Sequence, residues 1–205
     1  MYESESPFAA LVVAHGAGAG QKSPWMTRMA AGLAERGFAT ATFDFPYMAA
    51  GKSVPDRAPV LEQAWRDAIE RARAELPALP LFIGGKSMGG RISSHVASQG
   101  DAGAIAGLVF FGYPLHPPGR PEQRRDAHLP AIQEPMLFIQ GARDTFGTAE
   151  EIRRLVPLLR RATLHEIEGG DHGYKVPKRL GTLEEVMARV MDVATSWARS
   201  VTTPK

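Results

Sequence analysis

Hydrophobic residues occur along this chain in short runs that alternate with longer segments of mixed apolar and polar residues. The short runs have the length of buried strands, and the longer segments carry apolar residues at the spacing of an amphipathic helix. The expected strands are residues 10–14, 38–45, 79–83, 105–111, 135–140 and 163–168. The expected helices are 23–36, 59–75, a helix from the turn at 84–90 to about residue 99, 148–161 and 182–200.

This order of elements indicates the fold class. Strands that are apolar along nearly their whole length are typical of a parallel sheet covered on both faces. Right-handed crossovers then place helices on each side. We therefore predict an α/β protein with a doubly wound, mostly parallel six-stranded sheet and helices on both faces. The length of 205 residues fits one domain, residues 1–205.

One long segment, residues 112–133 (GYPLHPPGRPEQRRDAHLPAIQ), fits neither pattern. Irregular loops of this length in a compact domain are usually functional or disordered. We expect 112–133 to form a lid-like loop over a binding site.

Composition and charge narrow the possible partners. Lys and Arg together number 24 and Asp and Glu 22, for a formal net charge of +2, and the basic residues form no block. We therefore expect no nucleic-acid partner and no membrane association. The absence of cysteine excludes a disulfide, a thiol nucleophile and a thiolate metal site. No apolar run approaches the ~20 residues of a membrane span, and the acidic N-terminus does not resemble a signal peptide, so we expect a cytoplasmic protein.

The stretch GGKSMGG, residues 84–90, has two interpretations. A phosphate-binding loop requires a glycine five residues before Gly85, and the chain has Pro80 there. A nucleophile-presenting turn requires G-x-S-x-G between a strand and a helix, and Gly85, Ser87 and Gly89 satisfy it. We expect Ser87 to be a nucleophile and Lys86, in a variable position of the motif, to face solvent at the helix start.

A second glycine-rich stretch, HGAGAG at residues 15–20, leaves an alternative open. It follows the first expected strand, and Asp44 closes the second strand, where a ribose-binding acid lies in dinucleotide-binding folds. The spacing is G-x-G-x-G, however, with Gln21 where the G-x-G-x-x-G fingerprint has its third glycine.

Two further residues follow strand ends in the order that a serine triad of this architecture requires, which is Ser, then Asp or Glu, then His. Asp144 follows the fifth expected strand and His172 the sixth. The alternatives are that Asp144 caps the helix near Thr148 and that His172 is a solvated loop residue. Asp171 is a poor orienter of the His172 ring because it is adjacent in sequence.

The motifs GGKSMGG, GARD and GGDHG, in this order, resemble those of the α/β-hydrolase superfamily. Together with HGAGAG and FDFPYM, the chain resembles more narrowly the small predicted hydrolases related to testis-expressed protein 30, with dienelactone-hydrolase-like enzymes as distant kin. The resemblance covers roughly residues 8–198 and implies that strand 10–14 lies beside strand 79–83. Dienelactone hydrolase has a cysteine nucleophile, so its lactone specificity is not implied for Ser87.

The resemblance also implies further site residues. The backbone N–H groups of Met88 and Ala17 would hold the oxyanion. Tyr47 and Met48, after the second strand, are expected to line the acyl pocket, with ordinary partial burial as the alternative. In the 112–133 segment, Arg120, Arg124 and Arg125 could meet a carboxylate or phosphate of the substrate, and Arg124 and Arg125 are selected as the candidate binding residues. The alternative is that these arginines belong to a solvated basic loop and bind no substrate.

These observations predict a serine hydrolase that cleaves a carboxylester or thioester bond of a small molecule through Ser87, His172 and Asp144. No metal or cofactor is expected, because this mechanism needs none and the histidines lack metal-ligand spacing. Some eukaryotic relatives serve in chromatin complexes, so a non-catalytic binding or scaffold protein is the alternative function.

Overall fold

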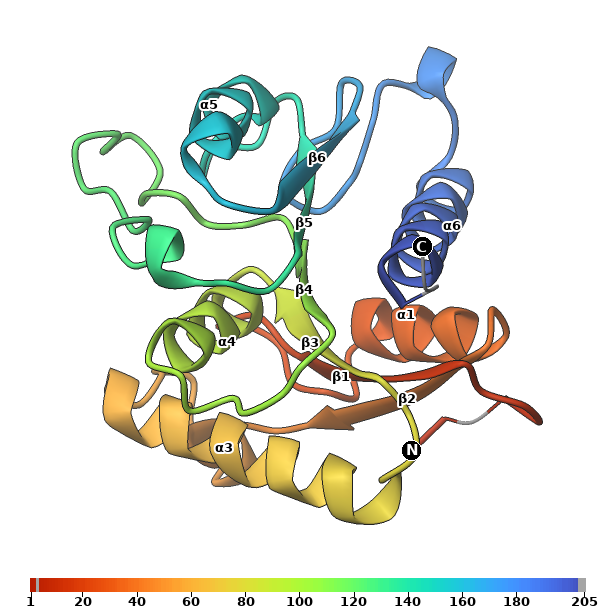
Figure 1. Ribbon diagram of the computed structural model, residues 1–205. Coiled ribbons are helices and arrows are strands. Elements are labelled where there is room, and N and C mark those ends of the chain that lie inside the picture. The colour runs from red at the N-terminus through yellow and green to blue at the C-terminus, as the bar shows by residue number, and fades with distance from the viewer. Residues whose placement is uncertain (3, 203–205) are drawn as a thin grey trace.

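The computed structural model describes residues 1–2 and 4–202 and contains a six-stranded, wholly parallel sheet (Figure 1). The strand order is β2-β1-β3-β4-β5-β6. The strands are β1 (Ala9–Ala14), β2 (Phe38–Phe43), β3 (Leu81–Lys86), β4 (Gly107–Phe111), β5 (Met136–Gly141) and β6 (Ala162–Ile167). All six expected strands are present, and the predicted fold class is confirmed.

Helices cover both faces of this sheet (Figure 1). They are α1 (Pro24–Ala34), α2 (Pro46–Ala49), α3 (Ala58–Glu75), α4 (Met88–Ser98), α5 (Ala149–Leu155) and α6 (Leu183–Thr202). The short α2 was not expected. The helix expected over 148–161 ends at Leu155, and a 3₁₀ turn at Val156–Leu158 follows, because Pro157 cannot donate a backbone N–H to continue the helix. Two further 3₁₀ turns are Leu129–Ala131 and Lys178–Leu180.

The two sides of the sheet have separate hydrophobic cores, because successive side chains of a strand point to opposite faces. In β1, Leu11 and Val13 pack with residues of α1 and α6, whereas Val12 and Ala14 pack with residues of α3 and α4. Every residue of β1 is buried. This explains why the strand is apolar throughout instead of alternating with polar residues.

The sheet topology fixes where a site can form. From β1 the chain passes to β2 on one side and then to β3 on the other, so the direction of strand addition changes between β1 and β3. Ala14 pairs with Gly85 in this register. Parallel α/β sheets bind ligands outside the carboxyl ends of the strands at such a point. The loops after Ala14 and Lys86 therefore meet at the expected place.

The 112–133 segment is tied to the body of the protein. Ser94 Oγ of α4 lies 2.8 Å from His128 Nε2, and the His116 N–H donates to the Phe146 carbonyl at 3.0 Å. Leu129 and Ile132 are fully buried. These contacts hold the segment beside α4, and its movement as a lid stays a prediction.

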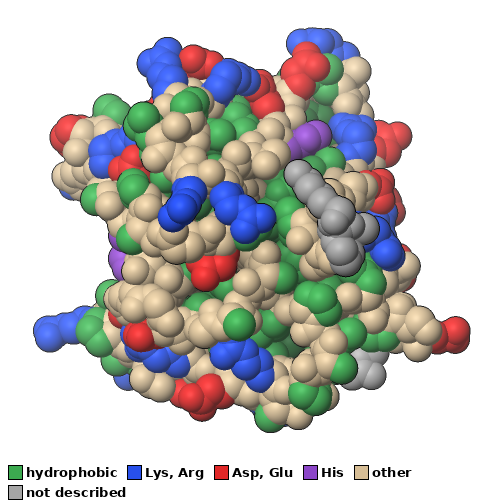
Figure 2. Space-filling model, in the orientation of Figure 1, with side chains coloured by type: hydrophobic (Ala, Val, Ile, Leu, Met, Phe, Trp, Pro, Cys, Tyr) green, Lys and Arg blue, Asp and Glu red, His purple; other side chains and the backbone are tan. Residues whose placement is uncertain are grey.

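The surface carries charges of both signs. On the face shown in Figure 2, basic and acidic side chains are interspersed and form no large area of one sign. Among the helices of the described residues, none combines the length and the hydrophobicity needed to cross a membrane.

Candidate active site

The turn between β3 and α4 presents Ser87 in an unusual backbone conformation, with φ of 50° and ψ of −116°. A positive φ is unfavourable for a residue with a side chain and persists only where neighbours enforce it. Here the Ser87 N–H donates to the Phe111 carbonyl at 3.2 Å. The serine therefore stands at the end of β3, directly before the first residue of α4.

Close approach of β1 explains the glycines around the serine. A Cβ atom on Gly85 or on Gly89 would lie 2.4 Å from the Ala14 carbonyl oxygen, closer than atoms of this kind can come. Both positions must therefore be glycine if β1 and its following loop are to reach the serine. Gly84 is equally constrained, since a Cβ there would lie 1.9 Å from the Val109 oxygen in the neighbouring strand.

Asp144 and His172 are brought together by the loops after β5 and β6. The His172 Nδ1 lies 2.7 Å from Asp144 Oδ2. Asp144 is 1% exposed, and its carboxylate also accepts from Gln140 Nε2 at 3.0 Å and from the Phe146 N–H at 2.8 Å. Three hydrogen bonds thus fix the carboxylate, and the carboxylate fixes the imidazole ring.

The alternative roles for these two residues do not fit the structure. Thr148, and not Asp144, caps α5, in a reciprocal capping box with Glu151. Asp171 Oδ1 accepts from the N–H groups of Gly173 and Lys175, so this carboxylate holds its own turn and does not orient the His172 ring. His172 is partly buried and its ring lies 4.4 Å from the ring of Phe146.

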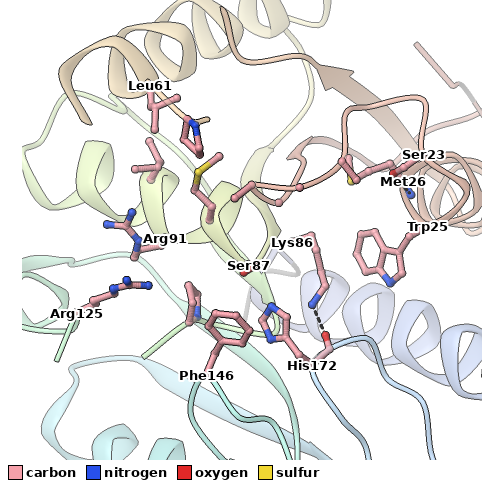
Figure 3. Close-up of a pocket in the computed structure, with 18 of the residues that line it drawn as sticks. Ser23, Trp25, Met26, Leu61, Lys86, Ser87, Arg91, Arg125, Phe146 and His172 are labelled. Atoms are coloured by element: carbon pink, nitrogen blue, oxygen red, sulfur yellow. Dashed lines mark hydrogen bonds between the residues drawn. The ribbon is translucent and has the colours of Figure 1, made fainter. Parts of the chain in front are cut away.

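Ser87 and His172 line one cavity of about 580 Å³, which is the site shown in Figure 3. Its walls are mostly apolar. The apolar contributions include Ala17, Trp25, Met26, Leu61, Met88, Ile92 and Phe146. The polar and charged contributions include Ser23, Asp56, Lys86, Arg91 and Arg125. A mostly apolar cavity with a few convergent polar groups is typical of a small-molecule site.

The resemblance implies an oxyanion site formed by the backbone N–H groups of Met88 and Ala17, and both residues line the cavity that Ser87 also lines. Met88 is the first residue of α4, so its N–H has no acceptor within the helix. Ala17 is exposed and lines the same cavity from the loop after β1. The backbone of this loop runs against the serine turn, since a Cβ on Gly16 would lie 3.6 Å from the Ser87 Cβ.

Tyr47 and Met48 do not line the cavity, contrary to the expectation that they form the acyl pocket. Tyr47 is 1% exposed, and its hydroxyl donates to the Ala17 carbonyl at 2.8 Å. Met48 packs behind the same loop, where a Cβ on Gly20 would lie 3.0 Å from its Cγ. Both side chains support the Ala17 loop from behind.

The remaining polar groups around this loop also hold it in place. Asp44 accepts from the Gln21 N–H at 2.7 Å and from Gln21 Nε2 at 3.1 Å, so its carboxylate is bound within the protein and does not present a ribose site. His15 is fully buried between the Gly16 carbonyl and the Phe45 N–H. Burial lowers the pKa of His15, which keeps its ring neutral and able to accept from Phe45.

Lys86 does not face solvent, and that expectation is wrong. It is the last residue of β3, and its ammonium donates to the backbone carbonyl of His172, as the dashed line in Figure 3 marks. The ammonium lies 5.5 Å from the centre of the Tyr174 ring and 5.8 Å from that of Trp25. Burial lowers the pKa of Lys86 to about 8, against an opposing effect of the negative charges of Asp144 and Asp171. No motif around Lys86 predicts this contact.

The two arginines expected to meet the substrate have different surroundings. Arg125 lines the cavity, but Arg124 does not, and its guanidinium forms an ion pair with Asp126. Arg91, which the sequence analysis did not select, lines the cavity from α4. Helix spacing could have identified Arg91, because a residue four positions after Ser87 lies on the same helix face.

No group of three or more His, Asp or Glu side chains is placed to hold a metal ion among residues 1–2 and 4–202.

Comparisons with known proteins agree with this architecture. Residues 7–199 match the model of a family described as alpha/beta hydrolase domain. The expectation of the α/β-hydrolase superfamily is confirmed.

Solved structures share the fold at low sequence identity. An alpha-beta serine hydrolase homologue from Coxiella burnetii superimposes with a TM-score of 0.74 at 16% identity, over 95% of this chain and 88% of that one. Dienelactone hydrolase from Anabaena variabilis gives 0.74 at 18% identity, over 97% and 88% of the two chains. A monoacylglycerol lipase from Paleococcus ferrophilus gives 0.70 at 18% identity, over 97% of each chain.

Proposed function

We propose that this protein, which belongs to the alpha/beta hydrolase domain family, is a serine hydrolase. Its substrate is a small molecule with a carboxylester or thioester bond. Ser87 is the nucleophile, His172 the general base and acid, and Asp144 the residue that orients the histidine. The N–H groups of Met88 and Ala17 form the oxyanion hole.

One observation carries the proposal, namely the 2.7 Å contact between His172 Nδ1 and Asp144 Oδ2 beside a cavity that Ser87 also lines. A carboxylate can only accept in this contact, so the neutral imidazole carries its proton on Nδ1. Nε2 is then left unprotonated. A base of this kind is what a serine hydroxyl needs to become nucleophilic.

The reaction follows from these positions. As Ser87 Oγ bonds to the acyl carbon, its proton passes to His172 Nε2 and the carbonyl electron pair moves to the oxygen. The N–H groups of Met88 and Ala17 donate to this oxyanion, each worth about 10²–10³ in rate. When the oxyanion collapses, the bond to the leaving oxygen or sulfur breaks, and His172 protonates the leaving group.

Water completes the cycle on the acyl-enzyme. His172 takes a proton from a water molecule as the water oxygen attacks the acyl carbon, and the Ser87 Oγ–carbon bond then breaks. His172 returns the proton to Oγ, and the carboxylic acid leaves. The buried negative charge of Asp144 stabilises the imidazolium that forms in both halves of the cycle.

The cavity is consistent with an acyl or alcohol group of modest size. Trp25, Met26 and Leu61 supply apolar surface of its wall. The similar structures include proteins named esterase, serine hydrolase and lipase, which supports an ester-type bond for this chain as well.

Replacement of the nucleophile tests the proposal. Turnover of a panel of short carboxylesters and thioesters, together with labelling by a fluorophosphonate, should be lost in Ser87→Ala. Ser53→Ala is the matched control, because Ser53 is exposed and lies outside the cavity. Full activity in Ser87→Ala would sink the proposal. A folded wild-type protein that neither labels nor turns over any ester would favour the non-catalytic alternative.

A further inference from the structure

Two guanidinium groups enter the wall of the candidate active site. Arg91 comes from α4 and Arg125 from the 112–133 segment, and both are partly buried. Figure 3 shows the two side chains on one side of Ser87, with Lys86 and Trp25 on the other. Burial lowers the pKa of Arg91, and the positive charge of Arg125 also lowers it, against opposing effects of Tyr113 and Glu62, which indicates that the two guanidiniums lie near each other.

Neither guanidinium has an anionic partner among the described residues. Arg91 Nη1 lies 3.4 Å from His95 Nε2, a weak contact with a neutral acceptor, and no ion pair joins Arg91 to a carboxylate. The Arg125 side chain has no hydrogen bond or ion pair within the described part of the chain. Arg124 is the informative contrast, because this more exposed neighbour is ion-paired with Asp126.

A carboxylate is present elsewhere in the cavity wall but does not neutralise the arginines. Asp56 lines the cavity, and its Oδ2 has no hydrogen-bond partner. No ion pair connects it to Arg91 or Arg125 among the described residues. Two like charges therefore remain together in a mostly apolar cavity, an arrangement that costs free energy unless an anion pairs with them.

We propose that Arg91 and Arg125 bind a carboxylate or phosphate group of the substrate, so that the enzyme prefers esters carrying a negative charge. A guanidinium presents a planar fork of N–H donors that matches both groups, and two such forks converge here. This inference rests on the proposed hydrolase function, of which it names the substrate class.

The distance along α4 sets the scale of such a substrate. Arg91 follows Ser87 by four residues, which is about 6 Å along a helix axis. An anion held by the guanidiniums is then separated from the reacting carbonyl by a short spacer of a few carbon atoms. A half-ester of a short dicarboxylic acid has this form.

Matched substrates test the inference through kinetics. 4-Nitrophenyl hydrogen glutarate carries the charge, and its methyl ester is the neutral counterpart. We expect wild-type kcat/KM to be higher for the charged ester, and this preference to fall about tenfold or more in Arg91→Gln and in Arg125→Gln, since each variant loses a charged hydrogen bond. Arg124→Gln is the matched control and should keep the wild-type preference. Arg125→Lys, which keeps the charge but not the fork, should retain part of it.

A binding measurement separates this inference from the proposed function. Calorimetric titration of Ser87→Ala with glutarate, and separately with inorganic phosphate, reports anion binding without turnover. We expect at least one of the two anions to bind, with an affinity that falls about tenfold in Ser87→Ala/Arg125→Gln and stays unchanged in Ser87→Ala/Arg124→Gln. The anion that binds identifies the group.

The outcomes are distinguishable. If wild type hydrolyses the neutral ester through Ser87 but the arginine variants change neither preference nor anion binding, the inference fails and the proposed function stands. If Ser87→Ala keeps full turnover, the proposed function fails, and the titrations still decide whether the arginines bind an anion. Equal losses on both esters in a variant that melts at the wild-type temperature also overturn the inference.

Discussion

The two sides of Ser87 differ in how completely their charged groups are paired. On one side, which we name the catalytic side (Lys86, Asp144 and His172), each charged or polar group is bonded to a protein partner. On the other, which we name the arginine side (Arg91 and Arg125), no carboxylate of the described residues forms an ion pair with either guanidinium, although the charge of Glu62 acts on Arg91 from a greater distance.

Under the proposed function, the catalytic side would act on any substrate, whereas the arginine side would select one. Donors and acceptors fixed before the substrate arrives need no reorganisation during the reaction, which is how electrostatic catalysis gains its strength. The guanidiniums of the arginine side form no ion pair with the described residues, so an anion that pairs with them would gain affinity there. The comparison predicts that substitutions on the catalytic side lower kcat, whereas substitutions on the arginine side change which substrate is used.

The largest expected effect is that of Asp144→Asn on the catalytic side. An amide can donate to His172 Nδ1 and so stabilise the wrong tautomer, with the proton on Nε2. We expect kcat on a short neutral ester to fall by about 10⁴, the loss known for the same substitution in a serine protease triad. Asp171→Asn is the control, since the Asp171 carboxylate accepts from the N–H groups of Gly173 and Lys175 and does not orient the His172 ring. A loss below tenfold in a folded Asp144→Asn protein would contradict the pairing argument.

The sequence predicts those elements and site residues that can be recognised from a short stretch of the chain. The strand runs, the glycines beside Ser87, and the positions of Asp144 and His172 after strand ends can all be recognised from a few neighbouring residues. Six strands and five helices were therefore expected near their observed places. The short α2 was missed because it spans only Pro46–Ala49 and has no periodicity to detect.

Contacts between distant segments could not be recognised in this way. Lys86 looked like a residue of the helix start, but β3 extends through it and its ammonium meets the carbonyl of His172, 86 positions away. Tyr47 was expected in the cavity, but it is buried behind the Ala17 loop. Gln140, which bonds Asp144 from within β5, has no motif at all.

Lys86→Met gives the next largest effect. It removes the hydrogen bond to the His172 carbonyl while keeping an apolar side chain of similar length beside Trp25 and Tyr174. We expect kcat to fall about tenfold, corresponding to one charged hydrogen bond, with KM on a neutral ester little changed. Lys175→Met, an exposed lysine three residues after His172, is the control. An unchanged kcat would show that the His172 loop holds its position without Lys86.

The lowered pKa of Lys86 makes stability depend on pH. The pKa of Lys86 is about 8 in the folded protein, against 10.5 for an ordinary lysine such as that of the unfolded chain. Between these two pH values the unfolded chain therefore binds more protons than the folded protein. The free energy of unfolding should therefore rise with pH over this window, by at most about 1.4 kcal/mol per pH unit from this group. Asp144 and Asp171 oppose the shift, and burial raises the pKa of the neighbouring Tyr174 well above its ordinary value.

Denaturant unfolding of wild type and Lys86→Met at pH 7.5, 9 and 10 measures this contribution, because other titrating groups cancel in the difference. We expect the free energy of unfolding of the wild type to rise relative to that of the variant as pH increases. Parallel curves would mean that the ammonium stays as well solvated in the fold as in the unfolded chain.

The smallest effect, on stability, distinguishes the two sides most directly. Arg125→Gln removes a charge that has no partner in the described protein, so no ion pair is lost and the free energy of unfolding should stay within about 0.5 kcal/mol of wild type or rise. Arg66→Gln is the contrast, because it breaks the ion pair with Asp101 at 2.7 Å and should lower stability by up to about 1 kcal/mol. Urea unfolding without added anions compares the variants. A clear loss of unfolding free energy in Arg125→Gln would mean that the guanidinium stabilises the fold without an added anion. That result would contradict the argument that Arg125 lacks a stabilising partner.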